Sequence, residues 1–448
     1  MRLYPATAYD FLRPVDSHWE ATAPPLGQSL VPQRGALTTD AAIIGAGYTG
    51  LHAAYRLAKT HGMQVVVLEA GTPGWGASGR NGGFCCLGSA KLSYEAMLRR
   101  HGHAASREFF DAQVDSVSFV DDFVNAHAID AERTGSGEFQ LAHRGWAMEG
   151  LKAEHDFLAA AFGFRTELLK REELAERGVG GAEFHGGLWS PLGFGLHPLR
   201  YLRGLAGAAL DAGAVVHSHS EVNAWRQVGG EHLLSTPAGE VRAKRVLLAT
   251  NAYADESVPS WIDGRFLPAL SGVLITRPLT VDERAAQRWT THEIAYDARN
   301  LVHYFRLLPD GRFLFGGRGG TDLSADGLER AGRTLRAHFA RMFPVFAHAE
   351  IERSWSGLVC LSLRLVPYIG PIGQMDGAYA ALAYHGNGVA FGSFAGRLIA
   401  DVMAGVEGAA RRIPRIAAGP LRRFPLPSLR RVYLKAAYSG YSLRDERP

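Results

Sequence analysis

The sequence predicts an α/β protein of two discontinuous domains, one built on a parallel sheet and the other on a mostly antiparallel sheet with helices. Residues 40–44 and 64–69 have the apolar composition of buried strands, and residues 51–60 between them are typical of a helix. Together they form a βαβ unit, which places two parallel strands in one sheet. Residues 309–311, Pro-Asp-Gly, separate two further apolar segments as the turn of an antiparallel hairpin does.

The other elements follow in order along the chain. The prolines in residues 1–37 predict an irregular arm. Apolar spacing predicts helices at residues 109–129, 148–162, 199–212, 328–343 and 388–404. Strands are expected at residues 214–217, 245–250, 300–308, 312–317 and 378–384. From residue 408 on, prolines and arginine pairs predict a docked, partly irregular extension, with a nucleic-acid or partner arm as the alternative.

Composition excludes several classes of protein. The 448 residues are 47% hydrophobic and 21% charged, which excludes global disorder. The net charge of +4 comes mainly from scattered arginines, so we expect no nucleic-acid partner. No apolar run reaches the roughly 18 residues of a membrane span, and no secretory signal is evident. The cysteines Cys85, Cys86 and Cys360 suit neither a disulfide framework nor a metal site, so we expect a soluble, cytoplasmic protein without metal.

The turn after the first strand carries glycines at a spacing that suits a dinucleotide. Gly45 allows a sharp turn, Gly47 lets a pyrophosphate approach the backbone, and Gly50 lets the helix pack closely on the strand. The free N–H groups of the helix N-terminus then face the phosphates. Glu69 ends the next strand and can accept both hydroxyls of an adenosine ribose. This pattern predicts a dinucleotide without choosing between NAD and FAD.

A second glycine-rich segment, residues 74–83, favours a flavin. Five glycines in ten residues are costly unless the backbone must pass a ligand closely. Ser78 and Asn81 add side-chain donors in the same segment. The alternative is a flexible surface loop, although Trp75 within the segment argues against it.

Taken in order, these features resemble the FAD-dependent amine and D-amino-acid oxidase family, also called the glycine/sarcosine oxidase family. Within it the chain is most similar to the gamma-glutamylputrescine oxidoreductase subgroup. The stretches that carry the resemblance are residues 43–51, 68–70, 74–83, 248–253, 304–306, 310–312, 316–318, 355–357, 367–370 and 385–389.

The resemblance implies a Rossmann-like FAD-binding domain of the glutathione-reductase type and a second α+β substrate domain with a mostly antiparallel sheet. The FAD-binding domain is expected to comprise residues 1–90, 195–255 and 355–448. The substrate domain is expected to comprise residues 91–194 and 256–354.

The resemblance also implies cofactor-binding residues. Glu69 would bind the ribose, Val222, expected in a strand pair, would contact the adenine, and the N-terminus of the last helix would face the pyrimidine edge of the flavin. The full expected set is Gly45, Gly47, Tyr48, Thr49, Gly50, Glu69, Ala70, Gly76, Ala77, Ser78, Arg80, Asn81, Gly82, Gly83, Val222, Ala249, Thr250, Gly386, Asn387, Gly388 and Val389.

Departures from the family pattern sharpen the expectation. Asn81 and Gly357 stand about where relatives attach FAD covalently through histidine or cysteine, so we expect non-covalent FAD. Val359 stands near the arginine that holds a substrate carboxylate in glycine-oxidase-like members, which argues against a simple α-amino acid. Leu314 stands near the lysine that promotes reaction with dioxygen in sarcosine-oxidase-like members, so the acceptor is dioxygen or a quinone.

The expected activity is oxidation of the C–N bond of a polyamine-derived, gamma-glutamylputrescine-like amine. A hydride passes to the flavin, and the resulting imine hydrolyses to an aldehyde. Tyr304, Arg306 and His385 are the candidate catalytic residues that line the site, although Arg306 could be an ordinary ion-pair partner and His385 a core histidine. The alternatives are a D-amino-acid or secondary-amino-acid (sarcosine-like) oxidase or dehydrogenase, and a flavin-binding protein without turnover.

Overall fold

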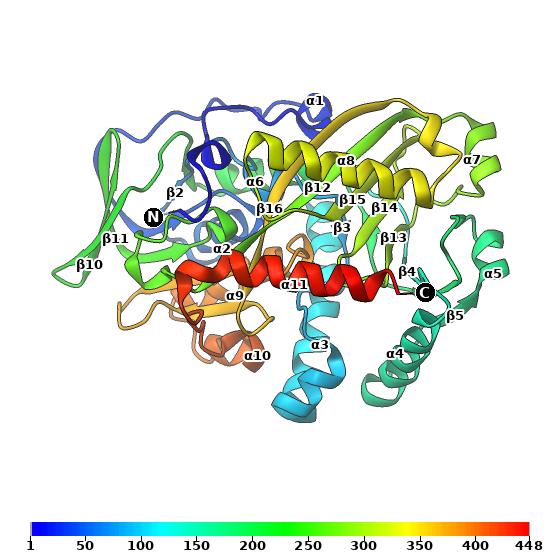
Figure 1. The fold of residues 1–448 in the computed structure, drawn as a ribbon. Helices are drawn as coiled ribbons and strands as arrows, with labels where there is room; N and C mark the ends of the chain where they lie inside the picture. The colour runs from blue at the N-terminus through cyan, green and yellow to red at the C-terminus, as the bar shows by residue number, and fades with distance from the viewer. Residues whose placement is uncertain (1, 448) are drawn as a thin grey trace.

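Two large sheets organise the molecule (Figure 1). The structure is a computed structural model that describes residues 2–447. The first sheet has β1 and β11 at its centre, and β18, β11, β1, β2 and β8 run parallel to one another, while β17 pairs antiparallel with β18. Its strands, in spatial order, are β17 (Tyr368–Pro371), β18 (Ala378–Leu382), β11 (Gly239–Leu248), β1 (Gly35–Ile44), β2 (Val65–Leu68) and β8 (Val215–His217), with β10 (Glu231–Thr236) and β9 (Ala224–Val228) attached to β11.

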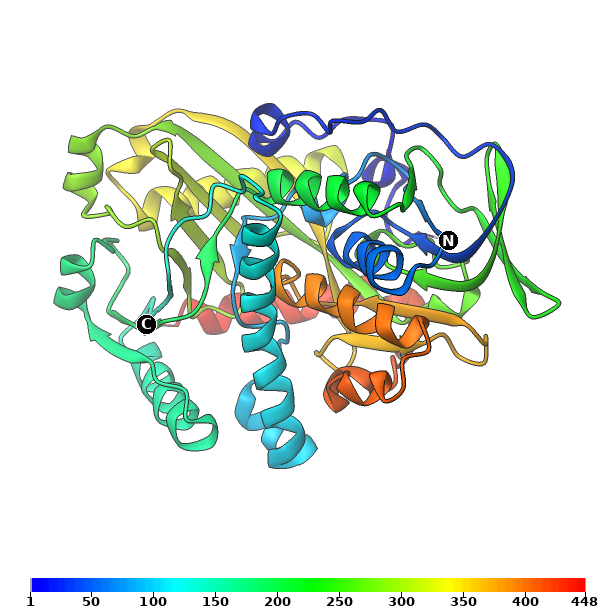
Figure 2. The same ribbon diagram turned by 180° about the vertical axis from the view of Figure 1, so that it is seen from behind.

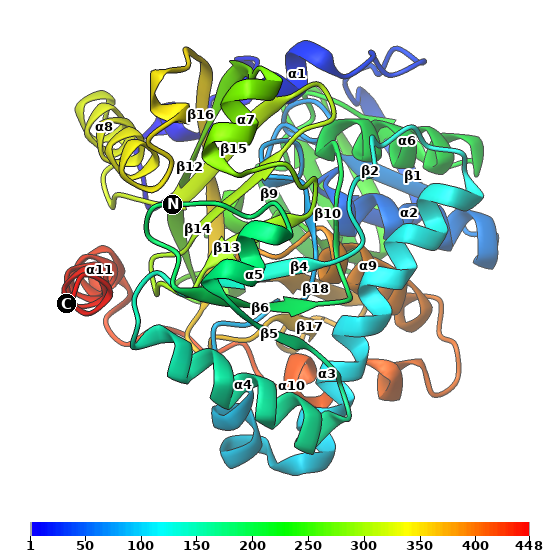
Figure 3. The ribbon, with the colours of Figure 1, turned by 90° about the vertical axis from the view of Figure 1, so that its right-hand side faces the viewer.

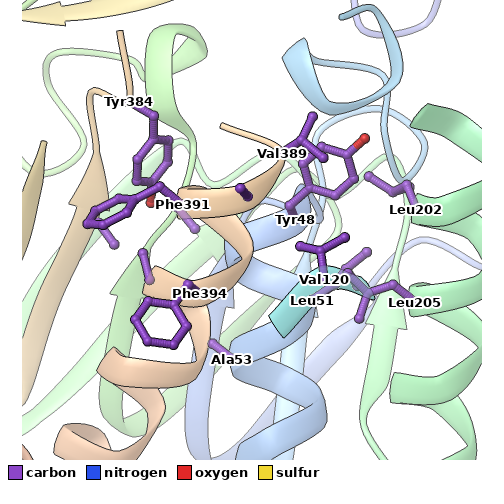
Figure 4. Close-up of a cluster of buried hydrophobic side chains, with 14 of the residues drawn as sticks. Tyr48, Leu51, Ala53, Val120, Leu202, Leu205, Tyr384, Val389, Phe391 and Phe394 are labelled. Atoms are coloured by element: carbon purple, nitrogen blue, oxygen red, sulfur yellow. The ribbon is translucent and has the colours of Figure 1, made fainter. Parts of the chain in front are cut away.

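Three helices cover one face of this sheet. They are α2 (Tyr48–His61), α6 (Pro198–Asp211) and α9 (Ala390–Met403), and Figure 2 shows them from behind in blue, green and orange. In the buried cluster of Figure 4, Leu51 of α2 lies between Leu205 of α6 and the aromatic side chains of α9. A side chain at Gly396 would collide with the backbone of Thr49, so a glycine is needed where α9 crosses α2.

The second sheet is mostly antiparallel, since β13 and β4 form its one parallel pair among the described strands. The helix α8 (Ala325–Met342) covers β12 and β15, while α4 (Ala147–Phe162) lies at the β6–β5 end (Figure 3). Its strands, in spatial order, are β16 (Ile351–Ser362), β12 (Phe266–Pro278), β15 (Arg312–Arg318), β14 (His303–Leu307), β13 (Ile294–Asp297), β4 (Glu138–Leu141), β6 (Gly186–Ser190) and β5 (Glu167–Lys170).

Smaller elements join the two sheets. The short strands β3 (Phe84–Cys85) and β7 (Phe194–Gly195) pair with each other. The long helix α3 (Tyr94–Ala126) packs on α9, α4 and α10 (Arg415–Ala418). The other α-helices before the C-terminal segment are α1 (His18–Thr22), α5 (Arg171–Glu176) and α7 (Val281–Gln287).

The C-terminal segment is more regular than the sequence suggests. It ends in a helix, α11 (Arg430–Asp445), drawn in red across Figure 1. Arg430 at its start is buried and donates to both oxygens of the Glu256 carboxylate, at 2.9 and 2.7 Å. Asp445 at its end accepts the N–H groups of Asn300 and Leu301 at 3.0 and 2.9 Å. The C-terminal extension therefore contains a helix, α11, that is anchored to the rest of the protein at both of its ends.

The structure differs from four expectations drawn from the sequence. The arm of residues 1–37 contains α1, capped by the Ser17 hydroxyl, and the first residues of β1. The helix expected from residue 109 begins earlier, at Tyr94, and its backbone kinks at Gly102, where φ is 77°. Val222 lies in the loop between β8 and β9, not in a strand. Strand β16 crosses the expected domain boundary at residue 355 and belongs wholly to the second sheet.

Candidate active site

A cavity of about 420 Å³ lies between the two sheets. On one side it is lined by residues that directly follow β1, β2, β11 and β18. The carboxyl ends of parallel strands converge there, which is where α/β sheets bind ligands. On the other side it is lined by residues of β12, β14, β15 and β16.

The turn after β1 presents free backbone to this cavity. Gly45 has φ of 105°, in the left-handed region that favours glycine. A Cβ on Gly47 would lie 2.9 Å from the Ser78 hydroxyl oxygen, so only hydrogen leaves the approach to the turn open. The Tyr48 N–H donates to that same oxygen at 3.2 Å. These groups form the N-terminal end of α2, the part of a helix that binds phosphate.

Glu69 stands at the end of β2 and lines the cavity. Its two carboxylate oxygens accept the N–H groups of Ala46 at 2.7 Å and Gly71 at 2.9 Å. Burial raises the pKa of Glu69, and these backbone donors oppose that rise. Each oxygen keeps a further lone pair, so the carboxylate can still accept the hydroxyls of a ribose.

Three tryptophans fix the segment 74–83. Trp19 donates to the Asn81 carbonyl, Trp355 to the Arg80 carbonyl and Trp75 to the Arg13 carbonyl, each at 2.8 Å. The Asn81 side chain adds bonds within the segment, to the Ser78 carbonyl at 2.9 Å and from the Gly83 N–H at 2.8 Å. The segment is therefore a rigid ledge along the cavity and not a flexible surface loop.

Arg306 does not line the cavity, contrary to its expected role as a lining residue. It is buried behind the ledge, where its guanidinium donates to the Gly82 carbonyl at 3.0 Å and to the Leu196 carbonyl at 2.6 Å. No carboxylate pairs with it within residues 2–447, and burial lowers its pKa to about 9. Arg306 is thus a positioning residue for the ledge.

We expect Arg306→Met to weaken FAD binding, because two buried carbonyls lose their charged donor and the ledge loosens. The FAD dissociation constant should rise by about tenfold, and the free energy of unfolding should fall by about 1–3 kcal/mol. Flavin fluorescence on dilution and chemical denaturation measure the two effects. Arg312→Met is the control, because Arg312 is on β15 and pairs with Asp310 and Glu352 at the surface, where the loss is about 1 kcal/mol or less. An unchanged FAD affinity in Arg306→Met would contradict this role.

His385 and the start of α9 form the end of the cavity. His385 has φ of 54° and a buried side chain whose Nε2 lies 3.3 Å from the Ser362 hydroxyl. Burial lowers its pKa to about 3, so the imidazole is neutral near pH 7. Tyr304 lines the second sheet's wall, with its hydroxyl 3.1 Å from the Ser271 hydroxyl, and burial raises its pKa. Both groups can orient a ligand without adding charge.

Three buried polar atoms at the cavity wall have no hydrogen-bond partner within residues 2–447. They are Thr250 Oγ1, His385 Nδ1 and Asn387 Oδ1. Buried polar atoms are rarely left unpaired, so such a cluster indicates that a polar ligand completes the site. Helix N–H groups for phosphate, a carboxylate for ribose and a long glycine ledge together fit FAD.

The structure brings nearly all the expected residues together. Of the expected cofactor-binding and catalytic residues, only Gly50, Gly83 and Arg306 do not line the cavity. A side chain at Gly50 would collide with the Gly45 carbonyl, and one at Gly83 would collide with the Leu196 carbonyl. Both glycines therefore serve close packing of the backbone.

Several residues of the cavity wall were not expected from the sequence. Arg318 lines the cavity, and its guanidinium donates to the His385 carbonyl at 2.6 Å. Its place in the Gly-Gly-Arg stretch of residues 316–318 was a signal that could have identified it. Lys91 also lines the cavity. Nothing in the sequence around Lys91 indicates this position.

Fold and site together define a flavin-dependent oxidoreductase. Residues 40–402 match the family described as "DAO: FAD dependent oxidoreductase", and the chain belongs to this family. FAD is therefore its cofactor.

Curated relatives extend over almost the whole chain. It is 30% identical over 437 residues to "Probable oxidoreductase OrdL" of Rhizobium meliloti, covering 97% of this chain and 98% of that protein. It is also 30% identical to "Gamma-glutamylputrescine oxidoreductase" of Escherichia coli, covering 91% of this chain and 93% of that protein. Among solved structures, glycine oxidase from Geobacillus kaustophilus shares the fold, with a TM-score of 0.68 at 23% identity over 82% of this chain and 95% of that one.

No helix within residues 2–447 combines the length and the apolar character needed to cross a membrane.

Proposed function

We propose that this protein oxidises the C–N bond of a polyamine-derived, gamma-glutamylputrescine-like amine with non-covalent FAD. The observation that carries the proposal is Val359, which lines the cavity beside Gly386. The family resemblance places the carboxylate-binding arginine of glycine-oxidase-like members near this position. An apolar side chain there favours a substrate whose reacting carbon carries no carboxylate. The similarity to gamma-glutamylputrescine oxidoreductase over 91% of the chain supports the same substrate class.

The chemistry that FAD supplies when bound is acceptance of a hydride from the carbon next to a neutral amine, which leaves an imine for hydrolysis to an aldehyde. The chain holds the substrate in place for that reaction. Tyr304 and neutral His385 flank the substrate without charge, and the Trp-anchored ledge gives the cavity a fixed wall. The first turns of α9 direct their N–H groups toward the cavity, where they stabilise negative charge.

Two further features support non-covalent attachment. The Asn81 side chain is fully engaged within the ledge. The Cys360 thiol is buried, and burial raises its pKa well above its usual range, so it is a poor nucleophile. The electron acceptor is dioxygen or a quinone.

Arg318 favours a second candidate, a D-amino-acid or secondary-amino-acid oxidase or dehydrogenase. Within residues 2–447 no carboxylate pairs with this guanidinium, so it can bind a substrate carboxylate. A flavin-binding protein without turnover is the remaining alternative from a different class.

Anaerobic bleaching of the bound flavin separates these candidates. We expect gamma-glutamylputrescine to reduce the flavin with a second-order rate constant at least about tenfold above that of sarcosine or D-alanine. This ratio corresponds to a difference of about 1.4 kcal/mol in activation free energy. Putrescine tests whether the glutamyl group is needed. A preference for sarcosine or D-alanine would support the Arg318 alternative, and no reduction by any amine would support a protein without turnover. Admission of air followed by measurement of peroxide then distinguishes dioxygen from a quinone.

A further inference from the structure

A second cavity of about 660 Å³ adjoins the first. It lies between helices α3 and α4 on one side and strands β4 and β6 on the other. The two cavities share five wall residues: Leu87, Gly88, Ala90, Lys91 and Tyr296. The second cavity is therefore the neighbouring space toward which a chain-like substrate with its reactive end in the first cavity would extend.

Two buried polar atoms at the wall of the second cavity lack partners. Glu138 is 3% exposed and Ser190 is 7% exposed, and both line the cavity. Neither Glu138 Oε2 nor Ser190 Oγ has a hydrogen-bond partner among residues 2–447. The two residues are directly paired across β4 and β6, so their side chains lie on the same face of the sheet. An unpaired carboxylate oxygen and hydroxyl at one point of a cavity wall indicate a ligand that donates hydrogen bonds.

The surroundings of Glu138 favour a positively charged donor. Glu154 of α4 also lines the cavity and adds a second carboxyl. Burial raises the pKa of Glu138 to about 8 and also raises that of Glu154. Without a ligand Glu138 is therefore mostly protonated near pH 7, and a bound cation would favour its ionised form. Two cationic side chains, Lys91 and Arg444, also line this cavity. Among the described residues neither forms an ion pair with Glu138 or Glu154, and Cys86 contributes a thiol to Glu138. The rings of Tyr94 and Tyr296, on the same walls, also suit a cation.

We propose that the second cavity binds a remote ammonium group of the amine substrate, with Glu138 as its counterion and Ser190 as a hydrogen-bond acceptor. An ammonium group has three N–H donors, so it can satisfy Glu138 Oε2 and Ser190 Oγ at once. The substrate class is then an amine with a second positive charge at a distance from the reacting nitrogen. This inference rests on the proposed amine oxidation and specifies the far end of its substrate.

The test compares α,ω-diaminoalkanes of increasing length with 1-aminoalkanes of matching length, using anaerobic flavin reduction to obtain the dissociation constant. In the unmodified protein we expect the best diamine to bind at least about tenfold more tightly than its monoamine. Glu138→Gln should weaken diamine binding by about tenfold to a hundredfold and leave monoamine binding within about twofold. Ser190→Ala should also weaken diamine binding, by a smaller factor, and leave monoamine binding unchanged. This variant takes the place of Glu138→Gln in the test if Glu138→Gln does not fold.

Glu149→Gln is the matched control, because Glu149 is exposed on α4 and does not line either cavity. Calorimetric titration of the dithionite-reduced holoenzyme with butane-1,4-diamine adds a readout without turnover, since the reduced flavin accepts no further hydride. We expect binding of this diamine to weaken in Glu138→Gln and not in Glu149→Gln. Equal binding of diamines and monoamines, or equal losses of both in Glu138→Gln, would overturn the inference while leaving amine oxidation intact. If no amine reduces the flavin, the proposed function fails, and the calorimetric titration alone decides whether a cation site exists.

Discussion

Gly47→Val is expected to produce a folded protein that has lost its yellow colour. The Cβ position at Gly47 is already 2.9 Å from the Ser78 hydroxyl oxygen, and the two valine methyl groups would fill the space through which a pyrophosphate reaches the backbone of the turn. The N–H groups at the start of α2 would then be screened from the phosphates. We expect the FAD dissociation constant to rise by about a hundredfold or more, which corresponds to about 2.7 kcal/mol.

The measurement is the ratio of flavin to protein absorbance after purification, followed by titration of the apoprotein with FAD. Gly332→Val is the control, because the Cβ position at Gly332 in α8 has open space around it. Circular dichroism shows whether each variant is folded. A Gly47→Val protein that is fully yellow would show that the cofactor does not approach this turn.

Arg430→Met should cause the largest loss of stability. Arg430 and Glu256 are both buried, with only 4% of each side chain exposed. The guanidinium also donates to the carbonyls of Phe266 and Pro427, each at 2.6 Å. Removing it leaves the Glu256 carboxylate buried without a cation, and breaking such a pair costs about 3–5 kcal/mol. The midpoint of chemical denaturation at a fixed FAD concentration measures the loss.

Lys435→Met removes a charge from the exposed side of the same helix and should change the free energy of unfolding by less than about 0.5 kcal/mol. The double variant Arg430→Met, Glu256→Met should regain part of the lost stability, because two apolar side chains can replace a buried ion pair. If the single and double variants are equally destabilised, the loss comes from packing and not from the stranded carboxylate.

Local patterns were sufficient to predict the elements around the cofactor. The βαβ unit follows from apolar runs interrupted by a glycine turn, and β1, α2 and β2 lie where this pattern predicts them. The docked helix α11 could not be predicted, because its stability depends on distant partners. In the sequence, Arg430 is one of several arginines in the C-terminal tail, and nothing near it indicates a partner. The fold places Glu256 beside it.

The candidate site shows the same contrast. Gly47, Glu69 and Ser78 were expected at one site because their neighbours in sequence define a motif, and all three line the cavity. Arg306 was placed on the wrong side of the ledge, because a strand pattern does not reveal which neighbour its side chain meets. Glu138 and Ser190 are about fifty residues apart in sequence, and they become a pair only through the register of β4 and β6.

The three tryptophans that hold the ledge come from separate parts of the chain: the N-terminal arm, the ledge itself and a strand of the second sheet. The surface that FAD recognises therefore exists only after both sheets and the first twenty or so residues have assembled. A ligand that binds only the assembled state shifts the equilibrium toward it. Bound FAD is therefore expected to raise the free energy of unfolding, by an amount that grows with the concentration of free FAD.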